Sequence, residues 1–155
     1  MDILKLNKYF LFLIFLLLLS CNDKAKKIEE TNLCNQDSNI HYRHNELSIL
    51  FIGNINKLDN KKIELLHIRN NKIISRLSHS ELKDDEIDFT ILPELHTNDS
   101  LKIVLKNDKS IFLHNFKNGP DYGGQKFLGC FFQTYMLDGK EKGLIDRYKI
   151  IVYIE

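Results

Sequence analysis

Residues 101–116, LKIVLKNDKSIFLHNF, decide the fold that this sequence predicts. The first half of the stretch places an apolar side chain at every second position: Leu101, Ile103 and Leu105. Asn107-Asp108 then supplies a turn, and a second apolar run covers residues 111–116. Because successive side chains of a strand point to opposite faces, this alternation predicts two strands joined by a turn.

Similar apolar runs recur along the chain at spacings of roughly 8–15 residues, which is typical of β-sandwiches. We expect eight strands, at residues 47–52, 63–68, 72–77, 87–91, 101–106, 111–116, 129–137 and 147–154. Alanine occurs once, at Ala25, and isoleucine is abundant, which disfavours helices. The one helical candidate covers residues 78–86, where Ser80 could cap the first turn.

This pattern predicts an all-β fold, an antiparallel β-sandwich of about seven or eight strands over residues 46–155. The run of strands is similar to those of immunoglobulin-like and transthyretin-like sandwiches. That likeness is one of pattern, and a fold alone does not indicate a function.

The amino terminus has the layout of an export signal. Lys5 and Lys8 precede eleven unbroken apolar residues, 9–19, and a polar stretch follows Cys21. As a helix, eleven residues rise only about 17 Å, which is short of the ~30 Å hydrocarbon core of a bilayer. We therefore favour a removable signal peptide over a permanent membrane span.

The four residues Leu18-Leu19-Ser20-Cys21 resemble the lipobox of bacterial lipoproteins. The resemblance implies that residues 1–20 are removed and that Cys21 becomes the acylated first residue of the mature protein. Asn22, which replaces the aspartate of the inner-membrane retention pattern, favours the outer membrane, facing the periplasm. The alternative is an ordinary signal peptide followed by an incidental cysteine.

Residues 21–45 are polar and are expected to form a tether between the membrane and the sandwich. Of the 22 basic and 21 acidic residues, the signal segment holds two and one, which leaves 20 of each in the mature chain. A neutral chain lacks the basic excess of a general nucleic-acid binder, so we expect no nucleic-acid partner.

Two cysteines remain after Cys21, namely Cys34 and Cys130. An exported compartment permits disulfides, so an even remainder suggests one bridge. Two unpaired buried thiols, or a metal site, are the alternatives. Neither cysteine has histidine or cysteine neighbours in sequence at ligand spacing, which disfavours the metal site.

Residues 118–125 interrupt the strand pattern with three glycines and a proline. We favour a long crossover between the two sheets, with Tyr122 packed over an edge. The alternative is a contact loop in which Asp121 and an exposed Tyr122 bind a partner.

No other motif indicates chemistry. The chain has no G-x-S-x-G nucleophile motif and no P-loop. His41 and His44 form the one histidine pair at metal-ligand spacing, and no third ligand completes it. We therefore expect no catalytic set, no metal and no cofactor.

Together these features predict a lipid-anchored protein of the bacterial cell envelope that is not an enzyme and binds another protein or supports an assembly. One alternative is an immunity or inhibitor lipoprotein that acts against a toxin or a lysozyme-like enzyme. A second alternative is a carrier of a small ligand or metal. The expected partners are the membrane, through the lipid on Cys21, and an unidentified protein.

Overall fold

The computed structural model describes residues 24–54, 63–105 and 109–154. The chain divides into two compact units, Met1–Leu33 and Cys34–Glu155. The predicted signal peptide, the predicted acylation site Cys21 and the predicted turn at Asn107-Asp108 lie outside the described residues.

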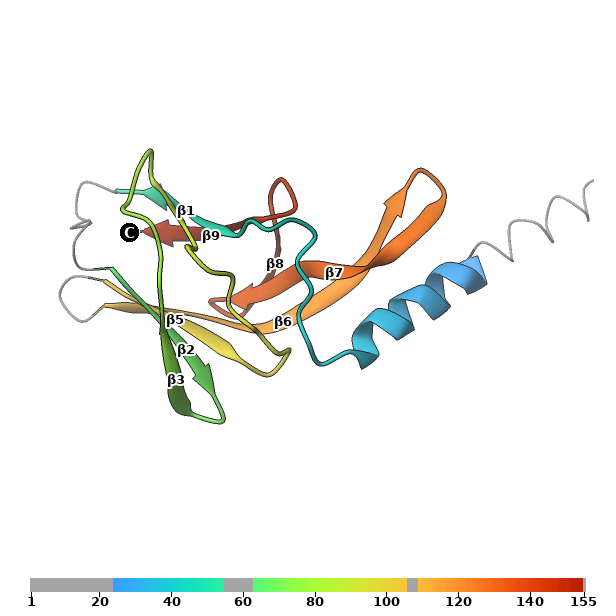
Figure 1. Cartoon of the computed structure of the whole chain (residues 1–155), viewed down its shortest axis with the longest axis horizontal. Helices are drawn as coiled ribbons and strands as arrows, with labels where there is room; N and C mark the ends of the chain where they lie inside the picture. Colours follow the sequence, from blue (N-terminus) through green and yellow to red (C-terminus); the bar gives the residue numbers. More distant parts are fainter. Residues whose placement is uncertain (1–23, 55–62, 106–108, 155) are drawn as a thin grey trace, which may run out of the picture. The chain divides into compact units, whose positions relative to one another are not determined.

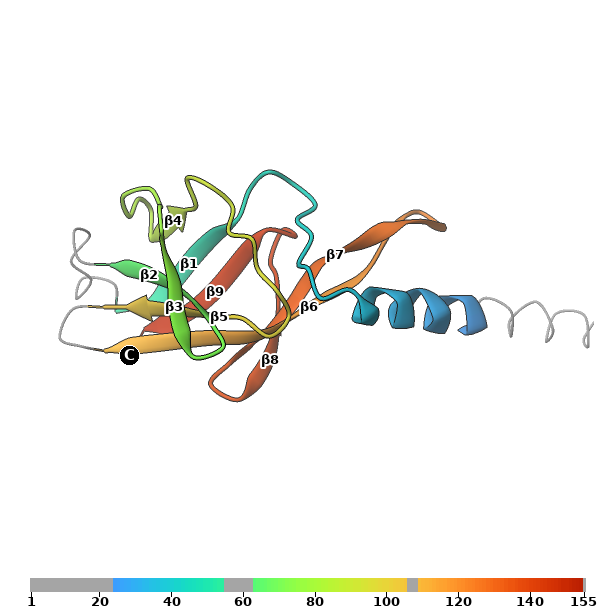
Figure 2. The same cartoon turned by 60° about the horizontal axis from the view of Figure 1, so that its bottom comes forward.

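Nine strands form two sheets in the second unit (Figures 1 and 2). The strands are β1 Ser48–Gly53, β2 Glu64–Arg69, β3 Lys72–Leu77, β4 Glu86–Asp88, β5 Ser100–Val104, β6 Ser110–Gly123, β7 Lys126–Leu137, β8 Lys140–Gly143 and β9 Lys149–Ile154. Six of them form a sheet in the order β3-β2-β5-β6-β7-β8, and three form a sheet in the order β4-β1-β9. The predicted all-β, sandwich-like fold is confirmed.

Two details of the sheets differ from the prediction. Strand β9 pairs with β1 in parallel, with Ser48 opposite Lys149, whereas all other pairs are antiparallel. A parallel pair needs a long connection, and the whole six-stranded sheet lies between β1 and β9 in sequence. Strand β8 is absent from the sequence-based prediction because it is short and charged and so lacks an apolar alternation. It lies at a sheet edge, where short charged strands are common.

The expected helix at residues 78–86 is wrong, and a helix forms instead at residues 24–36. Asp84 and Asp85 have φ angles of 49° and 66°, which an α-helix of L-residues does not adopt. They form a two-residue turn between Lys83 and Glu86. Residues 24–30 consist mostly of good helix formers, namely lysine, glutamate and the single alanine.

The compact unit begins at Cys34, earlier than the predicted start of the sandwich at residue 46. Cys34 and Ile40 are both buried. The backbone N–H of Ile40 donates a hydrogen bond to the carbonyl of Leu95, at 2.8 Å. Residues 34–45 therefore pack as part of the domain and do not serve as a free tether.

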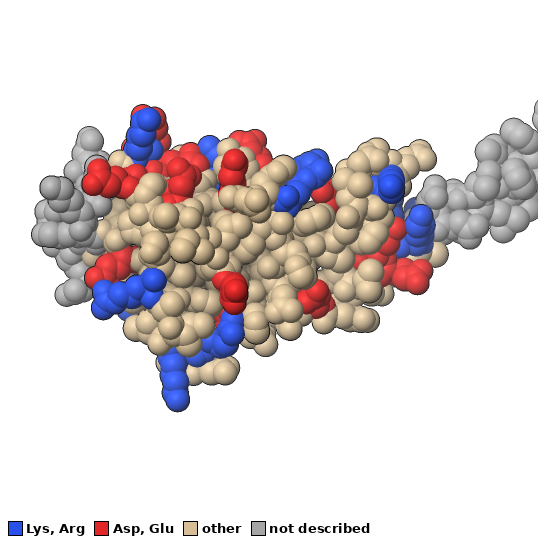
Figure 3. Space-filling view, in the orientation of Figure 1, with Lys and Arg blue, Asp and Glu red and all other residues tan. Residues whose placement is uncertain are grey.

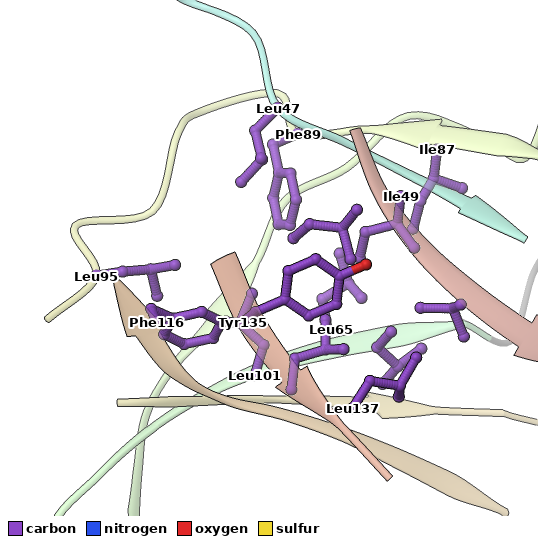
Figure 4. Packing of buried hydrophobic residues seen from close by; sticks show 14 of the residues in the cluster. Leu47, Ile49, Leu65, Ile87, Phe89, Leu95, Leu101, Phe116, Tyr135 and Leu137 are labelled. Atoms are coloured by element: carbon purple, nitrogen blue, oxygen red, sulfur yellow. The ribbon is translucent and has the colours of Figure 1, made fainter. Parts of the chain in front are cut away.

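The core lies between the two sheets, where alternate residues of strands such as β5 and β9 are buried (Figure 4). The predicted face of residues 101–105 is confirmed, because its three apolar side chains are buried. The facing sheet contributes the inward side chains of β1, β4 and β9: Ile49, Phe51, Ile87, Ile150 and Val152. Burial of this apolar surface supplies the main driving force for folding.

A single hydroxyl in this core hydrogen-bonds the backbone of the facing sheet. Tyr135 of β7 is fully buried, and its hydroxyl accepts from the N–H of Ile151 at 2.7 Å and donates to the carbonyl of Ile151 at 3.0 Å. Burial raises the pKa of this hydroxyl, which keeps it protonated and able to donate. Tyr135 thus satisfies the edge of β9 that faces away from β1.

A buried carboxylate organises the segment before β5. Asp99 is 0% exposed and accepts hydrogen bonds from His67 Nε2 at 2.7 Å and from Arg69 Nε and Nη2 at 2.7 and 2.8 Å. The backbone N–H of His96 donates to it as well, at 2.7 Å. Burial by itself would raise the pKa of Asp99, but the hydrogen bonds outweigh burial and hold it at about 2.

We predict that Tyr135→Phe lowers the free energy of unfolding by about 2 kcal/mol, because it leaves the buried N–H and carbonyl of Ile151 without their partner. Urea unfolding of the purified protein measures this loss. Tyr153→Phe removes the same atom from an exposed side chain and should change stability by less than about 0.5 kcal/mol. Equal losses in the two variants would show that the Tyr135 hydroxyl does not join the sheets.

We predict that Asp99→Asn destabilises the protein by about 3 kcal/mol at neutral pH, because Arg69 and His67 lose their anionic partner. The pKa of Asp99 is lowered in the folded state, so its contribution is complete above about pH 4 and disappears as the pH falls through about 2. Urea unfolding at several pH values should show the two proteins converging in acid. The control is Asp138→Asn, at an exposed turn. If the difference in unfolding free energy between the wild type and Asp99→Asn were the same at every pH, the assignment would be contradicted.

Candidate functional site

The two longest strands, β6 and β7, form a hairpin that extends past its neighbours in the sheet (Figure 1). Strand β5 pairs with β6 only as far as His114, and β8 pairs with β7 only as far as Thr134. Beyond these points the two strands continue as a ladder to a two-residue turn at Gly124-Gln125. We call residues 118–132 the distal hairpin.

The expected loop at residues 118–125 is wrong, because residues 118–123 belong to β6. Pro120 is tolerated here because β6 has no strand partner on its other side at this point. Gly119 leaves room for a neighbouring side chain, since a Cβ there would lie 1.6 Å from Gln133 Oε1. Glycine and proline thus mark an unflanked strand rather than a loop.

Three contacts hold the distal hairpin at its base. The predicted disulfide is present and joins Cys34 to Cys130 of β7, with 5.2 Å between the Cα atoms. Asn118, which is buried, accepts a hydrogen bond from the N–H of His41 at 3.1 Å and donates to the carbonyl of Asn39 at 2.6 Å. The N–H of Phe132 donates to the carbonyl of His41 at 2.6 Å. The hairpin is therefore fixed to residues 34–41 along one side.

The end of the distal hairpin is apolar. Tyr122 and Phe127 lie opposite each other, with ring centroids 6.1 Å apart and planes at 60°. Leu128 is 45% exposed. Tyr122 is half-buried. Leu128 follows Phe127 in β7 and is an exposed apolar side chain close to the turn.

A groove of about 250 Å³ lies at the base of the distal hairpin, and we call it the hairpin groove. Strands β6 and β7 supply one part of its wall, and the other parts come from two segments distant in sequence. The lining residues are Arg43, Gly119, Pro120, Asp121, Phe131, Phe132, Gln133, Leu144 and Arg147. Two cations and one anion thus face the same small space.

Asp121 forms the centre of the charged groups in the hairpin groove. Its carboxylate forms an ion pair with Arg43, and its side chain is 17% exposed. Its Oδ1 atom also accepts a hydrogen bond from the N–H of Tyr122, at 3.0 Å. Arg147 is more distant, with its Nη1 atom 3.9 Å from Asp121 Oδ1, and its side chain is 59% exposed. Arg43 is therefore the closer cation partner of Asp121, and Arg147 is the more exposed of the two arginines.

The histidine pair considered from the sequence does not assemble a metal site in the described chain. His41 Nε2 lies 2.7 Å from the carboxylate of Asp37, and this hydrogen bond lowers the pKa of Asp37. His44 is exposed. Among the described residues, no three histidine, cysteine, aspartate or glutamate side chains group as metal ligands.

A larger cavity, of about 470 Å³, opens beside the three-stranded sheet and is rich in carboxylates. Lys149 Nζ donates to Glu86 Oε2 at 2.8 Å, and Ser48 also hydrogen-bonds Glu86. These contacts join β1, β4 and β9, so Glu86 is explained by the sheet itself. Glu46, Asp84 and Asp88 also line the cavity.

Sequence reasoning found Asp121 but missed the two arginines and Gln133. In the sequence, Arg43 stands between His41 and His44, and Arg147 is the first residue of the expected strand 147–154. These residues come from separate segments of the chain, so no periodicity or motif spacing relates them. Only the folded arrangement brings them to one groove.

In the described part of the chain, no helix is long and apolar enough to cross a membrane. Comparison of the whole chain with protein-family models, with curated proteins and with solved structures finds no match in any of the three.

Proposed function

We propose that this protein is a lipid-anchored component of the bacterial cell envelope that binds another protein through its distal hairpin. In this proposal the protein performs no chemistry of its own. The observation that carries it is the extension of β6 and β7 beyond the rest of the sheet, with an exposed leucine near the end. The proposal places the protein at the outer membrane, facing the periplasm.

The anchor is supported by the sequence Leu18-Leu19-Ser20-Cys21 and the charged and apolar segments before it. Each CH₂ group of an acyl chain that is buried in the membrane contributes about 0.8 kcal/mol to the binding free energy. Two or three chains on one residue therefore give stable attachment. The polar residues that follow Cys21 suit the space beside a membrane surface.

Protein binding is supported by the composition and the rigidity of the distal hairpin. Tyrosine and arginine are enriched among the residues that dominate binding energy. Tyr122 belongs to the distal hairpin, and Arg43 and Arg147 line the groove at its base. The disulfide and Asn118 hold the hairpin in place before any partner arrives. A preorganised surface loses less conformational entropy on binding.

One alternative is favoured by a specific observation. A narrow projecting hairpin is complementary to a concave surface, such as the cleft of an enzyme. This shape supports the proposal of an immunity or inhibitor lipoprotein over that of a general structural protein. The carrier of a small ligand or metal has no comparable observation in its favour among the described residues.

We predict that the mature protein begins at Cys21 and carries lipid on that residue. Mass spectrometry of the amino-terminal peptide should show a diacylglyceryl thioether, and the protein should fractionate with membranes. Cys21→Ser should leave an uncleaved precursor without lipid, whereas Cys34→Ser should be cleaved and acylated normally. An amino-terminal peptide with a free thiol at Cys21 would contradict the anchor.

We predict that Leu128→Asp abolishes capture of the partner in crosslinked cells, because it places a charge at the centre of the proposed contact. The matched control is Ile73→Asp on β3. Ile73 is 60% exposed, and β3 is the edge strand of the six-stranded sheet that lies far from β7. Quantitative proteomics should show one protein that is enriched with the wild type and Ile73→Asp, and reduced at least about tenfold with Leu128→Asp, equivalent to about 1.4 kcal/mol. Equal enrichment with both variants would refute binding through the distal hairpin.

A further inference from the structure

Arg147 occupies a backbone position that favours glycine. Asp146 and Arg147 have φ angles of 50° and 69°, and they are the first two residues of a three-residue turn between Ile145 and Lys149. The turn is closed by a hydrogen bond from the N–H of Tyr148 to the carbonyl of Ile145, at 3.1 Å. Two consecutive positive φ angles define the type I′ turn, for which Asn-Gly and Asp-Gly are the preferred sequences.

Elsewhere the chain places a preferred Asp-Gly pair at similar φ angles. Asp138-Gly139, in the two-residue turn between β7 and β8, has φ angles of 51° and 72°. Both turns thus begin with aspartate at a positive φ angle, and the second residue is glycine in one and arginine in the other. A long, branched cation therefore stands where the backbone geometry favours glycine, and unfavoured residues at such positions cluster at functional sites.

Within the described chain, the guanidinium of Arg147 has few interaction partners. Its one ion pair there is the contact with Asp121 at 3.9 Å, which exceeds hydrogen-bond distance. Asp121 is already paired with Arg43. A guanidinium offers five N–H donors in a planar fork that matches a carboxylate, and those of Arg147 line the open hairpin groove.

We propose that Arg147 binds a carboxylate side chain of the protein partner inside the hairpin groove. This inference rests on the proposed function and names the chemistry of the partner at that site. Phe131 and Leu144 provide apolar contact for the methylene groups of an aspartate or glutamate. The nearby charge of Asp121 repels a dianion such as phosphate more strongly than it repels a single carboxylate.

The direct test titrates the ¹⁵N-labelled full chain, in detergent, with sodium acetate and observes Arg147 Nε–H and the amides of residues 145–148 by NMR. We expect saturable shifts in the wild type. In Arg147→Gly the dissociation constant should rise at least about tenfold, and Arg147→Lys should be intermediate because it keeps the charge and loses the fork. Acetate shifts that are unchanged in Arg147→Gly would overturn the proposal, as would tighter binding of inorganic phosphate at the same signals.

Stability separates a binding role from a structural one. Arg147→Gly places glycine at a φ angle of 69°, which glycine adopts without strain, so its urea midpoint should equal or exceed that of the wild type. A lower midpoint would assign Arg147 to the fold and overturn the proposal. The control for the loss of one positive charge away from the groove is Arg76→Gln. Glutamine is used instead of glycine because Arg76 lies within strand β3.

Failure of this inference is distinguishable from failure of the proposed function. If Leu128→Asp loses the partner and Arg147→Gly keeps it, the distal hairpin binds and the carboxylate site is wrong. If acetate binds at Arg147 and Leu128→Asp keeps the partner, the carboxylate site stands as a property of this chain and binding through the hairpin end is wrong.

Discussion

The two hydrogen bonds between the Tyr135 hydroxyl and the backbone of Ile151 are the interaction on which the arrangement of the two sheets depends. Burying the apolar faces of two sheets is favourable but not directional, so it does not by itself select one register. A buried hydroxyl that must satisfy a specific N–H and a specific carbonyl does select one. Because Tyr135 is in β7, the same strand that reaches across the core also continues into the distal hairpin.

Strand β7 therefore couples the core to the candidate site. Its proximal half contributes Tyr135 and Leu137 to the core, and its distal half carries Cys130, Phe131 and Phe132. The disulfide fixes the distal half to residue 34, and Asn118 fixes the facing strand to residues 39 and 41. A surface supported in this way can present exposed side chains with little loss of entropy on binding.

The charges of the molecule favour local recognition over long-range attraction. Acidic and basic side chains are interspersed on the face shown in Figure 3, and residues 21–155 hold equal numbers of each. A neutral surface provides little electrostatic steering of a distant partner. In such a molecule, specificity depends on particular groups, and the hairpin groove places two arginines and one aspartate within a small volume.

By itself, the sequence determined the all-β class, most of the strands and the partners Cys34 and Cys130, because period-two alternation and cysteine number are properties of the chain alone. The sequence analysis misplaced the helix and treated residues 118–123 as outside a strand. Glycine, proline and charged residues occur in turns, helix ends and edge strands alike, so their structure depends on neighbours that the sequence does not show. Tertiary structure alone decided that Arg43, Asp121 and Arg147 share a groove and that Tyr135 reaches β9. Contacts between distant segments follow from how the sheets pack, and local sequence patterns do not carry that information.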